Sequence, residues 1–500
     1  MRASAILLAA ILCLGLASPL VAKSAFAQVI ELPPLFPPPD DPVPDDGDET
    51  GSVPEGNSTE QTPGNFTSLP PPEPPAEQPA GNESEEQPIV PQEEIISTNP
   101  CLEYDEESNI VHVVCDADIY ELFSGLRDDS IMQQLGSGQI LINTNITVDD
   151  SATFNINSDK GVNYVKIAGN NGITVLGSLR IDGVNITSWD TASNSAVEQD
   201  GSGSIRRAYL FFSSSEGSYI YNSDIGYMGY NATGYRGVDL MYGSHNFAIV
   251  NSSFHHMWYA FYSNAAYNVT IDSSEYYDNH LYAVDPHTGT HNMTISNNIV
   301  HNNPIGLVCS LDCYDITFEG NTIYNNSGAG IFFSRNTHDS VARYNTIYDQ
   351  PVGVAFSESS NNQVYGNNII SVGRGIFLNN PEIRDDGDTT GNRIYNNAID
   401  NSAVGIAALR TSGNVASNNL FHNITMSHYR LDGGSTLTID NQMLANSTIE
   451  GRAGTNIPIF TNCSTITIDA NTYDASIQHS VPLSNQTITV ASVPRESGLQ

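Results

Sequence analysis

The 500-residue sequence predicts an all-β solenoid of the parallel β-helix type, and three observations support that prediction. Short apolar bursts recur along the chain, and each holds a small residue. These residues are Gly237, Ala260, Ala283, Gly306, Gly330, Gly353, Gly375 and Gly405, spaced by 23, 23, 23, 24, 23, 22 and 30. A second column keeps the same period, with Asn298, Asn321, Asn345, Asn368, Asn397 and Asn419. Within the bursts apolar and polar residues alternate with the two-residue period of strands.

A repeat of about 23 residues built from short strands is one coil of a β-helix. A helical repeat would show an apolar period of 3.6 residues, and these units do not. The long last spacing contains the inserted segment "NNPEIRDDGDTTGN". The asparagine column is expected to be an internal ladder, in which side-chain amides satisfy backbone groups at a turn.

The chain begins with two segments that do not belong to the solenoid. Residues 1–27 have the pattern of a secretory signal peptide: Arg2, an apolar run, and the small-residue site Ala25-Phe26-Ala27. Residues 28–100 form a Pro-rich acidic linker, expected to be disordered because its composition cannot bury a core. It serves as a spacer or is a solvated tail. No later run is apolar enough to span a bilayer, so the mature protein is expected outside the cytoplasm, either secreted or periplasmic. Association with the cell surface is a further alternative.

The remaining chain is also acidic. Of the 56 acidic residues, 16 lie between Glu31 and Glu94, which leaves 40 against 16 basic residues once Arg2 and Lys23 of the signal are removed. A nucleic-acid partner is therefore not expected, because phosphate binding requires a basic surface.

The solenoid is expected over residues 140–440, between an N-terminal cap at 101–139 and a C-terminal cover at 441–500. Within the cap, residues 116–135 read as a helix that Asp116 or Asp118 could cap, and such a helix would close the open end of the coils. Export permits disulfides, and Cys101 with Cys115 could form one. Cys309 and Cys313 are also close in sequence, and the odd count of five cysteines after the signal leaves one unassigned. Eight positions in the solenoid have the Asn-X-Ser/Thr pattern of glycosylation: Asn145, Asn185, Asn231, Asn251, Asn268, Asn292, Asn325 and Asn423.

Equivalent out-pointing side chains of successive coils stack about 4.8 Å apart, and one such stack combines acid, base and aromatic groups. In "YAVDPH" Val284 is expected to face the core, while Asp285 and His287 point outward. The predicted site is a groove that holds Asp239, Tyr262, Asn264, Asp285 and His287, with Tyr259 and Tyr282 at its edge. Exposed aromatic rings beside a histidine and carboxylates suit a sugar chain. The simpler alternative is that Asp285 and His287 are an ordinary polar surface pair.

Several segments in sequence order resemble the mannuronan C5-epimerases, and in particular the periplasmic, non-modular type. They are "ITSWDTA", "RAYLFF", "SDIGYMGY", "MWYAFYSNAAYNV", "YYDNHLYAVDPHTGTHN" and "FFSRNTHDSVARYNTIYD". The resemblance covers roughly residues 180–375 and implies a right-handed parallel β-helix. It also implies inversion at C5 of a uronate within a polyuronate chain. His287 would then be the base, Asp285 would orient it or share in proton transfer, and Tyr282 would donate a proton from the other face of the ring.

One departure from the family pattern concerns positive charge. Where the family has Ser-Arg-Glu, this chain has Ser310-Leu311-Asp312. Arg335 and Arg236 lie two coils away from His287 on opposite sides, and from there they are expected to bind neighbouring sugars. Three explanations stay open: a metal ion such as Ca²⁺ supplies the charge, the substrate is less anionic than mannuronan, or activity has been lost. No cofactor is otherwise indicated.

The leading hypothesis is thus an extracellular enzyme that epimerises uronate residues in an alginate-like polymer. A polysaccharide lyase on the same fold would use the same proton abstraction and then expel the C4 oxygen. A non-catalytic glycan-binding or cell-surface β-helix is the third hypothesis, because the acidic surface and Leu311 favour binding without chemistry.

Overall fold

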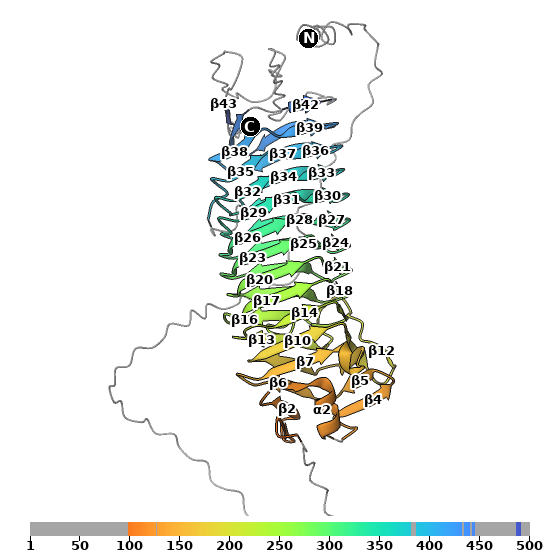
Figure 1. The fold of residues 1–500 in the computed structure, drawn as a ribbon. Helices are drawn as coiled ribbons and strands as arrows, with labels where there is room; N and C mark the ends of the chain where they lie inside the picture. The colour runs from red at the N-terminus through yellow and green to blue at the C-terminus, as the bar shows by residue number, and fades with distance from the viewer. Residues whose placement is uncertain are drawn as a thin grey trace, which may run out of the picture. The chain divides into compact units, whose positions relative to one another are not determined.

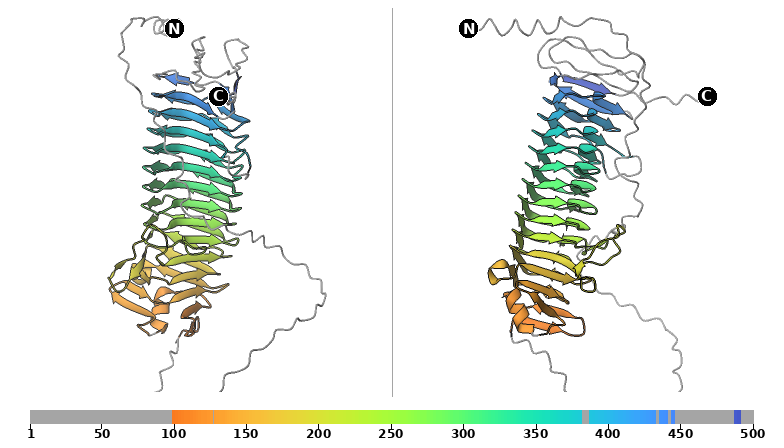
Figure 2. Two further views of the ribbon diagram at one scale, coloured as in Figure 1. Left: turned by 180° about the vertical axis from the view of Figure 1, so that it is seen from behind. Right: turned by 90° about the vertical axis from the view of Figure 1, so that its right-hand side faces the viewer.

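In the computed structural model, the described residues are 99–126, 128–381, 387–432, 435–440, 443–445 and 487–491. The expected signal peptide, nearly all of the acidic linker and most of the C-terminal cover therefore lie outside the described residues. The described part is a stack of coils, as Figures 1 and 2 show, with the N-terminal strands at one end and the C-terminal strands at the other. Each coil contributes one strand to each of three sheets, which makes the fold a parallel β-helix.

The three sheets are called A, B and C here. Sheet A contains β1 (Leu102–Asp105), β2 (Ile110–Val113), β6 (Asn145–Val148), β9 (Gly172–Val175), β13 (Tyr209–Ser213), β16 (Gly237–Met241), β19 (Tyr259–Asn264), β22 (Tyr282–His287), β25 (Ile305–Ser310), β28 (Ala329–Ser334), β31 (Val352–Ser357), β34 (Arg374–Asn379), β37 (Val404–Leu409) and β40 (Ser427–Asp432).

Sheet B contains β3 (Ala117–Asp118), β7 (Thr153–Asn157), β10 (Ser178–Asp182), β14 (Tyr219–Tyr221), β17 (His245–Val250), β20 (Tyr267–Asp272), β23 (His291–Ser296), β26 (Tyr314–Glu319), β29 (Val341–Arg343), β32 (Gln363–Tyr365), β35 (Arg393–Tyr395), β38 (Asn414–Ser417), β41 (Thr436–Asp440) and β43 (Thr487–Ala491).

Sheet C contains β4 (Met132–Gly136), β5 (Gln139–Ile142), β8 (Tyr164–Ala168), β11 (Asn185–Asp190), β15 (Asp224–Gly226), β18 (Ser253–His255), β21 (Glu275–Tyr277), β24 (Ile299–His301), β27 (Thr322–Tyr324), β30 (Thr346–Tyr348), β33 (Asn368–Ile370), β36 (Ala398–Asp400), β39 (Leu420–His422) and β42 (Met443–Ala445), with β12 (Ser195–Ala196) paired to β11. Pairing between coils is parallel, whereas β1–β2, β4–β5 and β41–β43 are antiparallel pairs.

The small-residue column is stacked as expected. Val284 is the Cα partner of Phe261 on one side and of Leu307 on the other, so the preceding residues Ala260, Ala283 and Gly306 lie one above another. A Cβ added to Gly306 would lie 2.5 Å from the carbonyl oxygen of Gly330. Space between adjacent backbones therefore limits this column to very small side chains.

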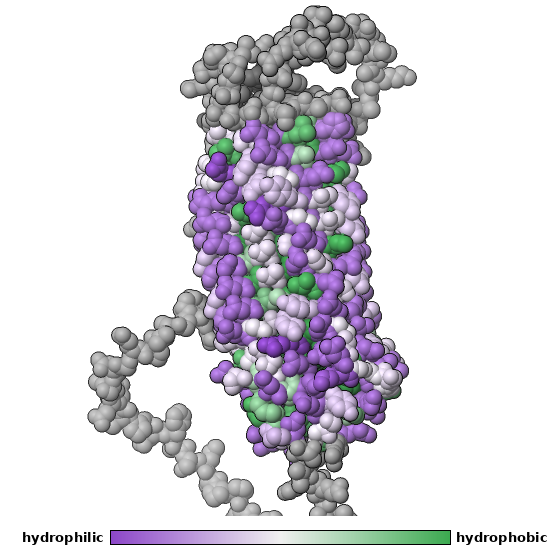
Figure 3. Space-filling view, in the orientation of Figure 1, coloured by the Kyte–Doolittle hydropathy of each residue, from purple (hydrophilic) through white to green (hydrophobic). Residues whose placement is uncertain are grey.

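The core fills the inside of the coils with aliphatic and aromatic side chains. Val284, Leu307 and Ile331 are fully buried members of the core and follow one another along sheet A. Out-pointing positions are mostly polar, and polar residues cover most of the face visible in Figure 3.

The asparagine ladder exists, with one correction. Asn298, Asn321 and Asn345 are buried, and the backbone N–H of each donates to the Oδ1 of the next asparagine at 2.9–3.0 Å. Asn345 donates to Asn367, not to Asn368, which lies on β33 with its side chain exposed. The prediction of Asn368 was wrong by one residue because both neighbours are asparagine. The ladder continues through Asn397 and Asn419.

The helix of the N-terminal cap is shorter than the predicted 116–135. Helix α2 covers Ile119–Leu126 and is followed by a turn and by strand β4, so the second half of the prediction was wrong. Asp118 caps the helix by accepting the N–H groups of Tyr120 and Glu121 at 2.9 and 2.8 Å. Asp128 ends it with a turn in which its Oδ1 accepts the N–H of Ser130 at 2.7 Å.

The four cysteines among the described residues divide into two groups. Cys101 and Cys115 form a disulfide, as expected. Cys309 and Cys313 are buried free thiols below the outer face of sheet A. Among the described residues there is no helix long and apolar enough to cross a membrane.

Candidate functional site

The predicted site residues gather on the outer face of sheet A, over β16, β19 and β22. Tyr262 is the Cα partner of Asp239 on one side and of Asp285 on the other, so these three residues stack in one column. A second column places Asn264 beside His287, and His287 beside Ser310 of β25. The register therefore brings together in space all five residues that the sequence placed in the groove.

His287 is held by two hydrogen bonds that determine its tautomer. A guanidinium nitrogen of Arg335, Nη2, lies 2.8 Å from His287 Nε2, and the Oγ1 of Thr288 lies 2.6 Å from His287 Nδ1. Because a guanidinium group only donates, Nε2 must present a lone pair, and the proton of the neutral ring sits on Nδ1 and is donated to Thr288. His287 is 7% exposed, and burial lowers its pKa to about 3, with Arg335 and Arg236 adding to the effect. The imidazole is thus an unprotonated base at neutral pH.

Arg335 is closer to the reacting group than its place in the sequence suggests. It occupies the turn after β28, one coil beyond Leu311 in the same column of turn residues. Its side chain extends back across β25, where Nε donates to Ser310 Oγ at 3.2 Å, and ends on His287. The expectation that Arg335 lies too far from His287 to act beside it was wrong, because an extended arginine side chain spans the distance between coils. The site therefore has a cation beside its base although position 311 is leucine.

The two carboxyl groups of the site are buried. Asp239 is 0% exposed and Asp285 is 2% exposed, and burial raises the pKa of each to about 7. The guanidinium groups of Arg335 and Arg236 act in the opposite direction on Asp285, and Arg236 does so on Asp239. Within the described part of the chain, Asp285 Oδ1 is buried without a hydrogen-bond partner. A buried acceptor of this kind is suited to a donor brought by a ligand.

Arg236 and the tyrosines form the wall of the site on its N-terminal side. The Arg236 guanidinium lies over the Tyr262 ring, 4.1 Å from its centroid, and the Tyr259 ring packs edge-on against both Tyr262 and Tyr282. The Tyr262 ring in turn contacts the His287 ring at 5.4 Å. Asp239 lies under this wall and accepts the backbone N–H of Arg236 at 3.1 Å. It is therefore placed to support Arg236, not to meet a ligand directly.

Two contributors to the site were missed in the sequence. Thr288 Oγ1 accepts a hydrogen bond from Nδ1 of His287 and so orients the ring, a role that the family resemblance gave to Asp285. Ser310 supports the Arg335 guanidinium at Nε. The stacking positions already placed Ser310 one coil after His287, so that contact was accessible to sequence reasoning, whereas the rotamer of Arg335 was not.

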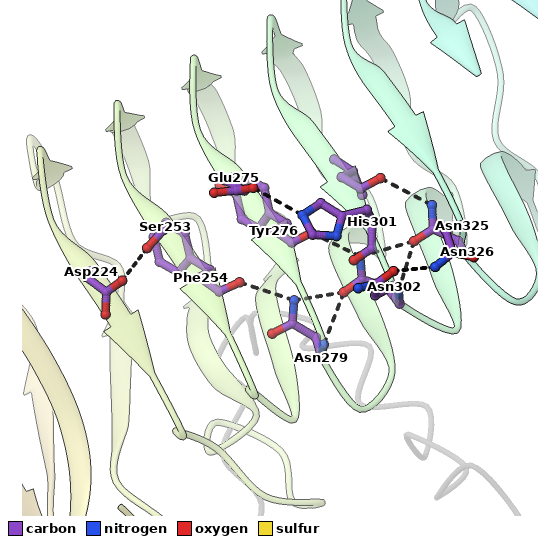
Figure 4. Close-up of polar contacts among 12 residues, drawn as sticks. Asp224, Ser253, Phe254, Glu275, Tyr276, Asn279, His301, Asn302, Asn325 and Asn326 are labelled. Carbon is purple, nitrogen blue, oxygen red and sulfur yellow. Dashed lines mark hydrogen bonds and ion pairs between the residues drawn. The ribbon is translucent and has the colours of Figure 1, made fainter. Parts of the chain in front are cut away.

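Two further features of the described part of the chain concern metal binding and a surface hollow. Among the described residues, no group of three or more His, Cys, Asp or Glu side chains is arranged to hold a metal ion. A shallow hollow lies elsewhere, at the turns that follow sheet C, lined by Asn279, His280, Asn302, Asn303, Pro304, Asn325 and Ser327. Figure 4 shows Asn279, Asn302 and Asn325 there on successive coils. The side-chain amide of Asn279 donates to Asn303 at 2.9 Å, and that of Asn325 donates to Asn302 at 2.6 Å.

The fold and this face together define a right-handed parallel β-helix protein with a histidine, two arginines, two carboxyl groups and a tyrosine wall on one sheet. A family model described as a right handed beta helix region matches residues 236–383, which include most of the site.

In sequence the chain is similar to mannuronan C5-epimerases. The protein of that name from Pseudomonas aeruginosa is 24% identical over 185 residues, which are 34% of this chain and 34% of that protein. The one from Pseudomonas putida is 28% identical over 136 residues, 25% of this chain and 26% of that protein. The chain thus spans about a quarter to a third of the length of the curated relatives it matches. In structure it is similar to the periplasmic alginate epimerase AlgG, with a TM-score of 0.57 and 19% identity over 68% of this chain and 85% of that one. That likeness concerns the fold.

Proposed function

We propose that this protein is a C5-epimerase of uronate residues in an alginate-like polymer. The observation that carries the proposal is the contact between His287 and Arg335: a neutral imidazole offers the lone pair of Nε2 at 2.8 Å from a guanidinium group. A base and a cation in contact are what removal of a proton next to a carboxylate requires.

In the proposed reaction, the substrate carboxylate takes the place of the imidazole as a partner of Arg335. His287 Nε2 is then free to accept the C5 proton. The C5–H bond breaks, and its electron pair moves into the carboxylate group to give an enolate-like intermediate. Arg335 stabilises the added negative charge, with Arg236 on the other side of Asp285 contributing at longer range. Without neutralisation of the carboxylate, the C5 hydrogen is too weak an acid to be removed.

The second half of the reaction returns a proton to C5 from the opposite face of the ring. Tyr282 is the proposed donor, because it stands at the edge of the site beside Tyr259. Asp285 is the proposed acceptor of a sugar hydroxyl, through the buried oxygen that has no hydrogen-bond partner in the described part of the chain. Ca²⁺ has no role in this scheme, since Arg335 provides the positive charge.

Export fits this function. The proposed substrate is an extracellular polysaccharide, and residues 1–27 have the pattern of a signal peptide. We propose a secreted or periplasmic location.

The experiment is incubation of the purified protein with a panel of polyuronates, followed by proton NMR of the polymer. Conversion of mannuronate to guluronate signals supports the proposal. A C4–C5 double bond with chain cleavage would identify a lyase on the same fold, in which Tyr282 protonates the C4 oxygen. Retention of a polymer without any chemical change would identify a glycan-binding protein.

A further inference from the structure

We propose that an aromatic platform on the N-terminal part of sheet A binds a stretch of the same polymer about three sugars away from the reacting residue. The platform consists of Tyr209, Phe211, Tyr230, Tyr235 and Tyr242. This inference rests on the proposed function for the identity of the polymer, and it extends that function by assigning a binding region outside the catalytic coil.

The platform is continuous with the site. Phe211 of β13 is the Cα partner of Asp239, so it is the next member of the column that runs through Tyr262 to Asp285. β13 is three coils from β22, which corresponds to about 14 Å at the usual spacing between strands. A uronate residue in an extended chain has a length close to one coil, so the platform lies about three sugars from His287.

Tyrosine rings flank Phe211 on both edges of the sheet. On one edge Tyr235 packs edge-on against Tyr209, with ring centroids 4.6 Å apart, and stacks with Tyr230 at 5.3 Å. On the other edge the Tyr242 ring meets Phe211 edge-on at 6.5 Å. Gly234 contributes to this arrangement, because a Cβ there would lie 3.2 Å from the Phe211 ring.

The outer two rings are exposed although they are aromatic. Tyr242 is 63% exposed and Tyr235 is 37% exposed, whereas Tyr209, which packs against Tyr235, is 9% exposed. Tyr242 also has a left-handed backbone conformation with φ of 55°, which bulky residues rarely adopt. Exposed, rigid rings with a polar edge are suited to stacking on sugar faces while the hydroxyl groups bind at the rim.

The C-terminal direction along the same sheet has different chemistry. Arg374 begins β34 with its guanidinium 4.8 Å from the Phe377 ring, and Arg430 is the Cα partner of Ala407 in the column that began at Asp239. Phe332 and Phe377 lie in the same column on this side but are buried, at 8% and 7% exposure. A uronate chain laid along sheet A would therefore meet exposed aromatic rings only on the N-terminal side of His287, beyond Arg236, among the residues described. The platform would contact the faces of the sugar rings, whereas the arginines would contact the carboxylates.

The test uses binding, so that it does not depend on turnover. The dissociation constants of a mannuronate trimer and octamer are measured by calorimetry in the inactive His287→Asn background. Tyr242→Ala and Tyr235→Ala are compared with Tyr344→Ala. Tyr344 is a matched control, since it is 58% exposed, has φ of 57° and contacts Tyr365 on sheet B.

For the octamer, each platform variant should raise the Kd about tenfold, the magnitude of one lost aromatic contact. The control should change it less than twofold, and the trimer, which prefers the catalytic coil, should be affected by none of the three. Equal octamer Kd values in the platform variants and in Tyr344→Ala would overturn the platform. If the platform variants weaken binding while the parent protein shows no epimerisation by NMR, the platform stands and the proposed function fails. An octamer that does not bind the parent at all overturns the platform as well.

Discussion

Histidine and tyrosine rings stack along the coils on sheets B and C of this molecule, whereas on sheet A the ring of His287 meets that of Tyr262 at a tilt. On sheet B, His245, Tyr267, His291, Tyr314 and His338 form a continuous stack with nearly parallel rings and centroid distances of 4.6–5.5 Å. On sheet A, the ring of His287 is tilted 35° from Tyr262, and its nitrogens bind Thr288 and Arg335.

The sheet B stack repeats and is half exposed, whereas the column of His287 on sheet A places unlike side chains beside one another, with Asn264 before the histidine and Ser310 after it. The residue that follows His287 in its column is Ser310, whose small side chain leaves room for Arg335 to reach across. A solenoid can thus create a site by placing different side chains at equivalent positions of successive coils. Columns of like residues stabilise a β-helix, and a column of unlike polar residues marks a place to look for function.

The largest loss of activity is expected when His287 is replaced, and His291 on sheet B provides the control. His287→Asn should reduce epimerisation at least a thousandfold, because it removes the base. His291→Asn, four residues along on the sheet B stack, should retain activity and lower the free energy of unfolding by about 1 kcal/mol through lost ring contacts. Initial rates by NMR and urea denaturation separate these outcomes. Comparable loss of activity in both variants would mean that the comparison between the two faces is wrong.

The next effect concerns the arginines. Arg335→Ala should lower kcat by about 10²–10³, as for removal of one charge-stabilising donor. The control is Arg343→Ala, which removes a guanidinium that pairs with Glu319 on sheet B, and it should change kcat less than twofold. Because Arg335 already provides the cation, Leu311→Arg should give no gain. A gain from Leu311→Arg would show that Arg335 does not meet the substrate.

Asp285→Asn should inactivate the enzyme and yet stabilise the fold above neutral pH. Burial raises the pKa of Asp285 to about 7, so its stabilising contribution is present below about pH 4 and is lost as the pH rises towards 7. The asparagine variant avoids that loss, which is about 4 kcal/mol at most. Its free energy of unfolding should exceed that of the parent at pH 8 but not at pH 4. Asp312→Asn, at an exposed turn one coil away, should show no such difference.

The smallest effect distinguishes two neighbouring asparagines. Asn367→Ala should cost about 1–3 kcal/mol of stability, because it leaves the buried N–H of Asn345 and the carbonyl of Ala342 without partners. Asn368→Ala on the exposed side should cost less than about 0.5 kcal/mol. Denaturation curves of the two variants check this, and equal losses would contradict the ladder as described.

The fold and the columns of the site could be predicted from the sequence because the period alone determines which residues stack. The 23-residue spacing placed Asp239, Tyr262 and Asp285 in one column without any knowledge of side-chain contacts. The burial of Asp285 and the reach of Arg335 could not be predicted, since they depend on rotamers and on how neighbouring side chains cover the face. The error at Asn368 has another cause: where two asparagines are adjacent, the period does not show which one points inward.

The most direct test of the account is epimerisation in D₂O. If His287 removes the C5 proton and a different group returns one from the opposite face, each guluronate formed should carry deuterium at C5, without any increase in ultraviolet absorbance. Guluronate formation and deuterium incorporation should disappear in His287→Asn and persist in His291→Asn, and the absorbance should stay constant in both variants. Guluronate that retains the original C5 hydrogen, or absorbance from a C4–C5 double bond, would contradict the account.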